Sequence, residues 1–163
     1  MKKILLCSFL VCLAVLGGNA QPRALGLRTG YKAAELSYQV QEKTNTMLEM
    51  DAGIGGQFWG TTEGAWFDAT ASYDWILKVG DACNFYLGQA LGVGYGYNSV
   101  YGNQCSRIRV NIGAQFGMEF LLGNHFAMSL DYRPTFNPIG CNDNVIHDMF
   151  TYYGAAFGLR YKF

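Results

Sequence analysis

Apolar and polar residues alternate along the last eleven positions of the chain, residues 153–163. In an extended segment, one face would carry Tyr153, Ala155, Phe157, Leu159, Tyr161 and Phe163. The opposite face would carry only Gly154, Ala156, Gly158, Arg160 and Lys162. Successive side chains of a strand point to opposite faces, so this pattern predicts a strand with one face in an apolar solvent.

Seven earlier segments show the same alternation: residues 25–32, 35–41, 47–55, 65–77, 85–97, 107–120 and 128–136. The clearest is 107–120, where Ile108 and Val110 alternate with Arg107 and Arg109. In a helix these charged residues would spread around the circumference and form no face. Gln89 interrupts the apolar face of segment 85–97, which suggests a bulge or a shifted register there.

Eight alternating segments predict an all-β fold, an eight-stranded antiparallel up-and-down barrel. Short connections near Asn45, at 78–84 and at 122–124 would lie at one end of the barrel. Connections at 33–34, 56–64, 98–106 and 137–148 would lie at the other end, and three of these four are longer than a tight turn. An even number of strands returns the carboxy terminus to the side of the amino terminus, which we expect to be the periplasmic side.

The first twenty residues have the features of a secretory signal peptide. Lys2 and Lys3 precede an apolar run at 4–16, and Gly18, Asn19 and Ala20 supply the small residues expected before a cleavage site. A membrane anchor is the alternative, but about 13 apolar residues are few for a helix that spans a bilayer. We therefore expect cleavage after Ala20, which leaves residues 21–163 as a single barrel domain.

The apolar face could point outward into lipid or inward, as in a soluble ligand-binding barrel. Two groups of aromatic residues at the strand ends favour lipid. One group is Trp75, Phe85, Phe120, Phe126, Tyr161 and Phe163, and the other is Tyr31, Phe67, Tyr95, Tyr97, Phe136 and Tyr153. The many glycines on the polar face also suit a narrow interior better than a solvated surface. A formal net charge of zero gives no indication of a nucleic-acid partner.

In the membrane orientation, charged residues of both signs face the lumen. The predicted network consists of Arg28, Glu49, Asp51, Asp68, Asp74, Arg107, Arg109, Glu119, Asp131, Arg133 and Arg160. An eight-stranded barrel is just wide enough for its own side chains to fill, and buried charges need partners. We expect a polar plug of ion pairs, with a narrow ion or solute path as the alternative.

Length, strand number, signal peptide and the terminal aromatic residues Tyr161 and Phe163 resemble the small outer-membrane barrels of the OmpA/OmpX type. The resemblance covers the whole mature chain and implies an integral protein of the Gram-negative outer membrane. It also implies contact with outer-membrane lipid and lipopolysaccharide, and passage through periplasmic chaperones. The barrel-assembly machinery would recognise Tyr161 and Phe163. We expect a monomer, with no nucleic-acid partner.

Few residues suggest a catalytic or metal-binding site. A lipid-modifying enzyme of this size would need a serine, a histidine and an acid near the outer face. His125 falls at the opposite end, whereas His147 and Asp148 lie in the last outer connection, near Asp143 and one loop away from Ser99 and Ser106. Their spacing matches no motif, and Cys141 beside them completes no paired metal-ligand pattern. We therefore expect no catalytic site, no metal and no cofactor.

Two features of the outer connections remain open. Cys105 and Cys141 lie in adjoining connections and would be able to form a disulfide in an oxidising exterior, which would leave Cys83 unpaired. Phe58 and Trp59 could bind a partner or simply extend the aromatic girdle. The sequence thus favours a non-enzymatic barrel that is structural or binds a still unknown extracellular ligand through its loops. A lipid-modifying enzyme and a narrow channel are the alternatives.

Overall fold

The computed structural model describes residues 21–30, 33–55, 65–98, 105–139, 150–151 and 154–163. These residues form ten strand segments: β1 (Gln21–Gly30), β2 (Ala33–Lys43), β3 (Thr46–Gly55), β4 (Trp66–Lys78), β5 (Cys83–Asn98), β6 (Cys105–Leu122), β7 (Phe126–Tyr132), β8 (Thr135–Ile139), β9 (Phe150–Thr151) and β10 (Ala155–Lys162). Within these ranges, no helix has the length and apolar character needed to cross a bilayer.

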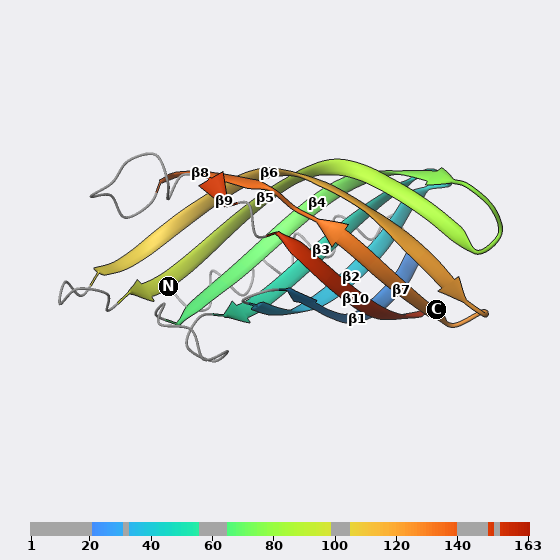
Figure 1. Ribbon diagram of the computed structural model, residues 1–163, viewed down its shortest axis with the longest axis horizontal. Helices are drawn as coiled ribbons and strands as arrows, with labels where there is room; N and C mark the ends of the chain where they lie inside the picture. The colour runs from blue at the N-terminus through green and yellow to red at the C-terminus, as the bar shows by residue number, and fades with distance from the viewer. Residues whose placement is uncertain (1–20, 31–32, 56–64, 99–104, 140–149, 152–153) are drawn as a thin grey trace.

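The sheet closes on itself (Figure 1). Each strand from β1 to β6 pairs antiparallel with the next, β6 pairs with β7, β7 with β10, and β10 with β1. The closing ladder runs from Ala24 opposite Lys162 to Gly30 opposite Ala156. Closure removes the open edges that would otherwise leave backbone N–H and C=O groups unpaired.

Two interruptions explain why eight strands are seen as ten segments. β6 pairs with β7 up to Phe116 opposite Tyr132 and continues with β8 at Gly113 opposite Thr135, in the same register. Pro134 lies between these pairs and has no N–H to donate to the ladder, so the strand is broken there. β9 pairs with β8 just as β10 pairs with β7, so β9 and β10 follow one another along the same strand. The predicted eight-stranded antiparallel barrel is confirmed.

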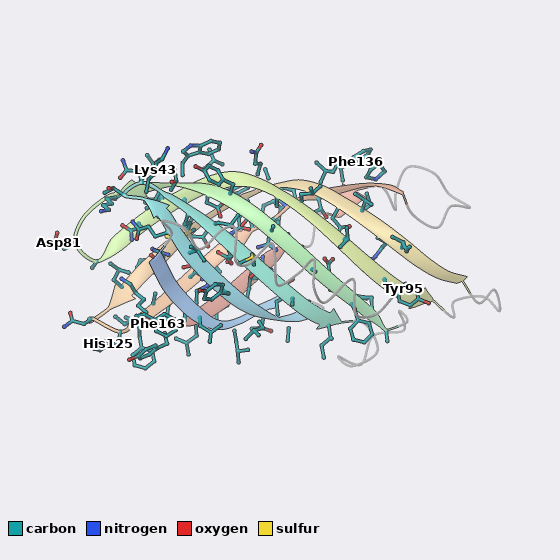
Figure 2. All side chains as sticks on the ribbon, turned by 180° about the vertical axis from the view of Figure 1, so that it is seen from behind. Lys43, Asp81, Tyr95, His125, Phe136 and Phe163 are labelled. Atoms are coloured by element: carbon teal, nitrogen blue, oxygen red, sulfur yellow. The ribbon has the colours of Figure 1, made fainter. Side chains whose placement is uncertain are left out.

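Three short turns lie at one end of the barrel, at residues 44–45, 79–82 and 123–125. We call this the turn end and the opposite end the loop end. In the last turn, Gly123 has a φ of 67°, a left-handed conformation that glycine adopts without steric cost. Figure 2 shows Lys43, Asp81, His125 and Phe163 at the turn end, with Tyr95 and Phe136 toward the loop end.

The apolar face of the wall points outward. Leu27, Leu91 and Ile108 are 66%, 59% and 67% exposed, whereas Glu49 and Asp74 on the inner face are fully buried. The expected irregularity at Gln89 is wrong: β5 pairs without a break with β4 and β6, and Gln89 lies opposite Tyr73 and Ala114. Gln89 points outward, as its position in the alternation requires, and its side chain is exposed. β5 therefore has no bulge at this position.

Several inward-facing glycines leave room for side chains from neighbouring strands. A Cβ added at Gly88 would lie 2.1 Å from the backbone oxygen of Tyr73 and 2.3 Å from a carboxylate oxygen of Asp74. At Gly117 it would lie 2.7 Å from the ring of Tyr86. The glycines therefore allow the inner side chains to lie flat against the wall of a narrow barrel.

We predict that Gly88→Ala destabilises the barrel by about 1–3 kcal/mol, because the added methyl group would overlap backbone and require the wall to move. Gly80→Ala is the matched control, since a Cβ there meets nothing within 4 Å. Urea titration of the detergent-folded variants gives the two midpoints. Equal midpoints would contradict the close packing at Gly88.

Candidate functional site

The lumen is the candidate site because it gathers most of the charged side chains of the described chain. Arg28, Glu49, Asp51, Asp131 and Arg160 are all buried. They come from β1, β3, β7 and β10, and the strict alternation of each strand turns them toward the barrel axis. A charge in such a position needs ionic and hydrogen-bonding partners.

Glu49 is the most connected acid. Its Oε1 lies 2.6 Å from Nη2 of Arg160, and neither side chain is exposed. Ser37 donates to the same oxygen over 3.0 Å, while the amide nitrogens of Gln39 and Gln115 donate to Oε2 over 2.8 Å and 3.5 Å. The carboxylate is thus surrounded by donors from three other strands, β2, β6 and β10.

Arg28 on β1 binds Asp131 on β7. Its Nε and Nη2 donate to Oδ1 of Asp131 over 2.8 Å and 2.5 Å, and its Nη1 pairs with Glu35 on the adjacent strand. The hydroxyl of Tyr86 donates to Oδ2 of Asp131 over 3.2 Å. Both oxygens of this carboxylate are therefore bonded.

Arg133 crosses the lumen from the segment between β7 and β8. It forms an ion pair with Asp51 on β3, and its Nε donates to Oε1 of Gln115 over 2.7 Å. Nη1 lies 3.9 Å from Glu35, and Nη2 lies 4.0 Å from Glu49. Arg133 therefore connects the groups of bonds around Glu49 and Arg28.

Arg23 also belongs to the network of charged side chains in the lumen, although the alternation of residues does not predict it. Arg23 forms a bidentate pair with Glu119 and donates to Oε1 of Gln39 over 2.5 Å. By simple alternation it should share the outward face of Leu25 and Leu27. The register of β1 against β2 shifts between Pro22 and Ala24, so the extra residue at this bulge is free to turn inward.

Two acids of the predicted network have no ion pair within the described part of the chain. Asp74 accepts a 3.0 Å hydrogen bond from Ser72 through Oδ2, and its buried Oδ1 has no partner there. Asp68 accepts hydrogen bonds from Thr70 over 3.1 Å and from Asn111 over 2.7 Å.

The remaining basic members lie at the loop end. Arg109 forms no ion pair with any described residue, and its guanidinium carbon lies 5.2 Å from the centre of the Trp66 ring. Arg107 lies in β6, and its side chain is outside the described part.

The terminal aromatic residues lie on the outer surface at the turn end. The Tyr161 ring stacks on His125 with centroids 5.6 Å apart and meets Phe126 and Phe163 edge to face. The backbone N–H of Phe163 donates to the carbonyl oxygen of Arg23 over 3.2 Å. His125 is therefore part of an aromatic cluster on the outer surface and lies apart from the lumen acids.

Several sequence predictions fall outside the described residues. These are the signal segment 1–20, Phe58, Trp59, Ser99, Cys141, Asp143, His147, Asp148 and the side chains of Cys105 and Ser106. Cys83 is described and is a free, partly exposed cysteine at the turn end. Within the described ranges no three metal-ligating side chains come together.

Comparison with known proteins supports the fold through structure. No protein-family model matches the sequence, and no curated protein matches it. The N-terminal β-barrel domain of Pseudomonas aeruginosa OprF superposes with a TM-score of 0.68 at 10% identity, covering 89% of this chain and 98% of that domain. Neisserial surface protein A superposes with a TM-score of 0.60 at 12% identity, covering 88% and 95%.

The chain has the fold of the small eight-stranded outer-membrane β-barrels. A de novo designed transmembrane β-barrel also superposes on this barrel, with a TM-score of 0.53 at 13% identity, covering 87% and 95%. At these identities the likeness concerns the path of the backbone. The lumen of this barrel therefore has to be understood from its own side chains.

We predict that Glu49→Leu lowers the free energy of unfolding by about 3–5 kcal/mol, because Arg160 would remain buried without its carboxylate. The double variant Glu49→Leu/Arg160→Met should lose less than the single one, since it removes both charges. Urea midpoints of the folded variants in detergent measure the difference. An additive double variant would show that the two side chains do not act as a pair.

Proposed function

We propose that this chain is an integral, non-enzymatic protein of the Gram-negative outer membrane. The observation that carries the proposal is the continuous apolar outer face of a closed barrel with charged residues inside. Soluble monomers rarely expose contiguous apolar patches of more than a few hundred Å². Here large apolar side chains on all the long strands are exposed, among them Leu36, Ile54, Leu87, Ile112 and Leu159. Lipid is the solvent that suits this surface.

The lengths of the connections at the two ends of the barrel support an orientation in the membrane. Outer-membrane barrels have short turns on the periplasmic side and longer connections outside. Residues 44–45, 79–82 and 123–125 form such turns, and the last strand ends beside them. We therefore assign the turn end and both termini to the periplasm. Phe126, Tyr161 and Phe163 then lie at the inner headgroup level, where outer-membrane barrels carry a girdle of aromatic residues.

The same end of the chain carries the proposed assembly signal. Tyr161 and Phe163 are 45% and 70% exposed, so both rings are accessible on the outer surface. We assign them to recognition by the barrel-assembly machinery after transport by periplasmic chaperones. Outer-membrane lipid and lipopolysaccharide are the remaining partners. We assign the mature protein as a monomer.

The ion pairs of the lumen support the proposal that side chains fill the interior and block it. The bonds from Arg23 to Glu119, from Arg160 to Glu49 and from Arg133 to Asp51 cross the interior, and the bond from Arg28 to Asp131 joins β1 to β7 past β10. A hydrated ion would have to break such pairs at a cost of several kcal/mol each. We assign a structural role to the wall and a binding role to the connections at the loop end.

We predict that the processed protein sediments with the outer membrane and migrates differently on a gel before and after boiling. A closed barrel with paired backbone groups resists detergent until it is heated, and unfolding then changes its mobility. Density fractionation and unheated electrophoresis provide the test. Recovery of the folded chain in an aqueous extract without detergent or lipid would refute the membrane assignment.

We predict that the purified barrel gives no discrete openings in a planar bilayer, because paired side chains fill its interior. The double variant Glu49→Ala/Arg160→Ala removes the central pair and should allow openings if it remains folded. Asp81→Asn, in an exposed turn, is the matched control for a change of charge. Discrete openings of the unmodified protein would favour the alternative of a narrow solute channel.

A further inference from the structure

A groove crosses the outer surface of the wall over β5, β6 and β7 and ends at β10. Its volume is about 380 Å³, and small-ligand sites typically measure about 300–1,000 Å³. Its sides include the outward side chains of Phe85, Phe116 and Leu130, which are 40%, 44% and 55% exposed. Almost all of its lining surface is apolar. A molecule that fits this groove therefore has to be apolar too.

The groove remains open because a small residue follows large ones in the outer face. Phe116 lies opposite Tyr132, and Tyr132 lies opposite Ala155. The Tyr132 ring packs on Phe116, with centroids 5.2 Å apart and an angle of 58° between the ring planes. Ala155 also lines the groove and offers only a methyl group. The groove is therefore not filled at the end formed by β7 and β10, which run side by side (Figure 1).

The floor of the groove is fixed from the inside of the barrel. Gly117 and Asp131 lie opposite each other, face inward and form part of this floor. The Asp131 carboxylate accepts hydrogen bonds from Arg28 over 2.8 Å and from Tyr86 over 3.2 Å. The bonds of the lumen thus hold the wall beneath the groove in place. A preformed site loses less conformational freedom when it binds a ligand.

The depth of the groove matches one leaflet of a bilayer. Phe85 lies two residues after Cys83, where β5 begins at the turn end, whereas Ala155 lies seven residues before Lys162, where β10 ends. Strand residues rise about 3.3 Å each and membrane strands are tilted by about 45°, so seven residues cover about 16 Å of depth. This is about half of the hydrocarbon core of a bilayer. A membrane span of a partner protein would cross the whole core, but an acyl chain reaches only to its middle.

We propose that this groove binds one acyl chain of a phospholipid from the leaflet on the turn-end side. The inference rests on the proposed membrane function, because the groove is continuous with the outer face assigned to lipid. Lipid tails are as apolar as the groove, so packing contacts with the rings of Phe116 and Tyr132 provide the preference for this site. The bound lipid therefore stays longer than lipids on the rest of the wall.

The test uses the mature barrel folded into vesicles of phosphatidylethanolamine and phosphatidylglycerol. The probe is a phosphatidylethanolamine with a diazirine in the middle of one acyl chain, which bonds to a neighbouring side chain on illumination. Mass spectrometry counts the adducts at Tyr132 in the groove and at Tyr38, another partly buried tyrosine on the outward face, in β2. As the fraction of probe is raised, adducts at Tyr132 should saturate, whereas adducts at Tyr38 should rise in proportion.

Ala155→Phe fills the deep end of the groove and should lower the adducts at Tyr132 at least about threefold, since packing contacts are individually small. Ala71→Phe is the matched control. Ala71 is also an exposed alanine, and it lies seven residues before Lys78, where β4 ends at the turn end. This variant should be labelled as the unmodified protein is. Unheated gel migration shows that each variant is folded before it is labelled.

Proportional labelling of Tyr132, or an equal effect of the two variants, would overturn the proposal, while adducts at Tyr38 would leave the membrane assignment intact. Absence of adducts at both tyrosines would overturn the membrane assignment as well. A dimer on the unheated gel that Ala155→Phe abolishes, with Tyr132 free of adducts, would assign the groove to a second copy of the chain and would also overturn the proposal.

Discussion

The pairing of β1 with β10 is the constraint on which the other features depend. In a bilayer, an unpaired backbone N–H or C=O group finds no water to bind, so an open sheet would be costly at both edges. The ladder from Ala24–Lys162 to Gly30–Ala156 removes those edges. Once the sheet is closed, each strand has an inner and an outer face, and period two assigns every side chain to one of them.

The small size of the barrel explains why the charged side chains of the lumen contact one another. Eight strands enclose a space that side chains can fill, so inner charges lie in contact with one another. The bonds around Glu49, Asp131 and Asp51 are shared through Gln39, Gln115 and Ser129, so the separate pairs form one continuous network. Neutral donors matter here because each carboxylate has more acceptor positions than the arginines alone can occupy.

The alternation of residues was sufficient to predict the strands, their number and the face that most of the described side chains occupy. It failed where the period itself changes, since the bulge at Arg23 reverses the expected direction of that side chain. The polar residue Gln89 also led to the prediction of a bulge or a shifted register, but β5 pairs without a break at this position. The partner of each arginine could not be predicted, because Arg28 and Asp131 are 103 positions apart and meet only through the register of the closed sheet.

The contacts of the last residues have a consequence for biosynthesis. Lys162 donates to the carbonyl of His125, Phe163 donates to that of Arg23, and β1 pairs with the final strand. β1 therefore gains its second neighbour only after β10 has been synthesised. Because pairing of segments so distant in sequence is slow, closure of the ring is expected to be a late step in folding.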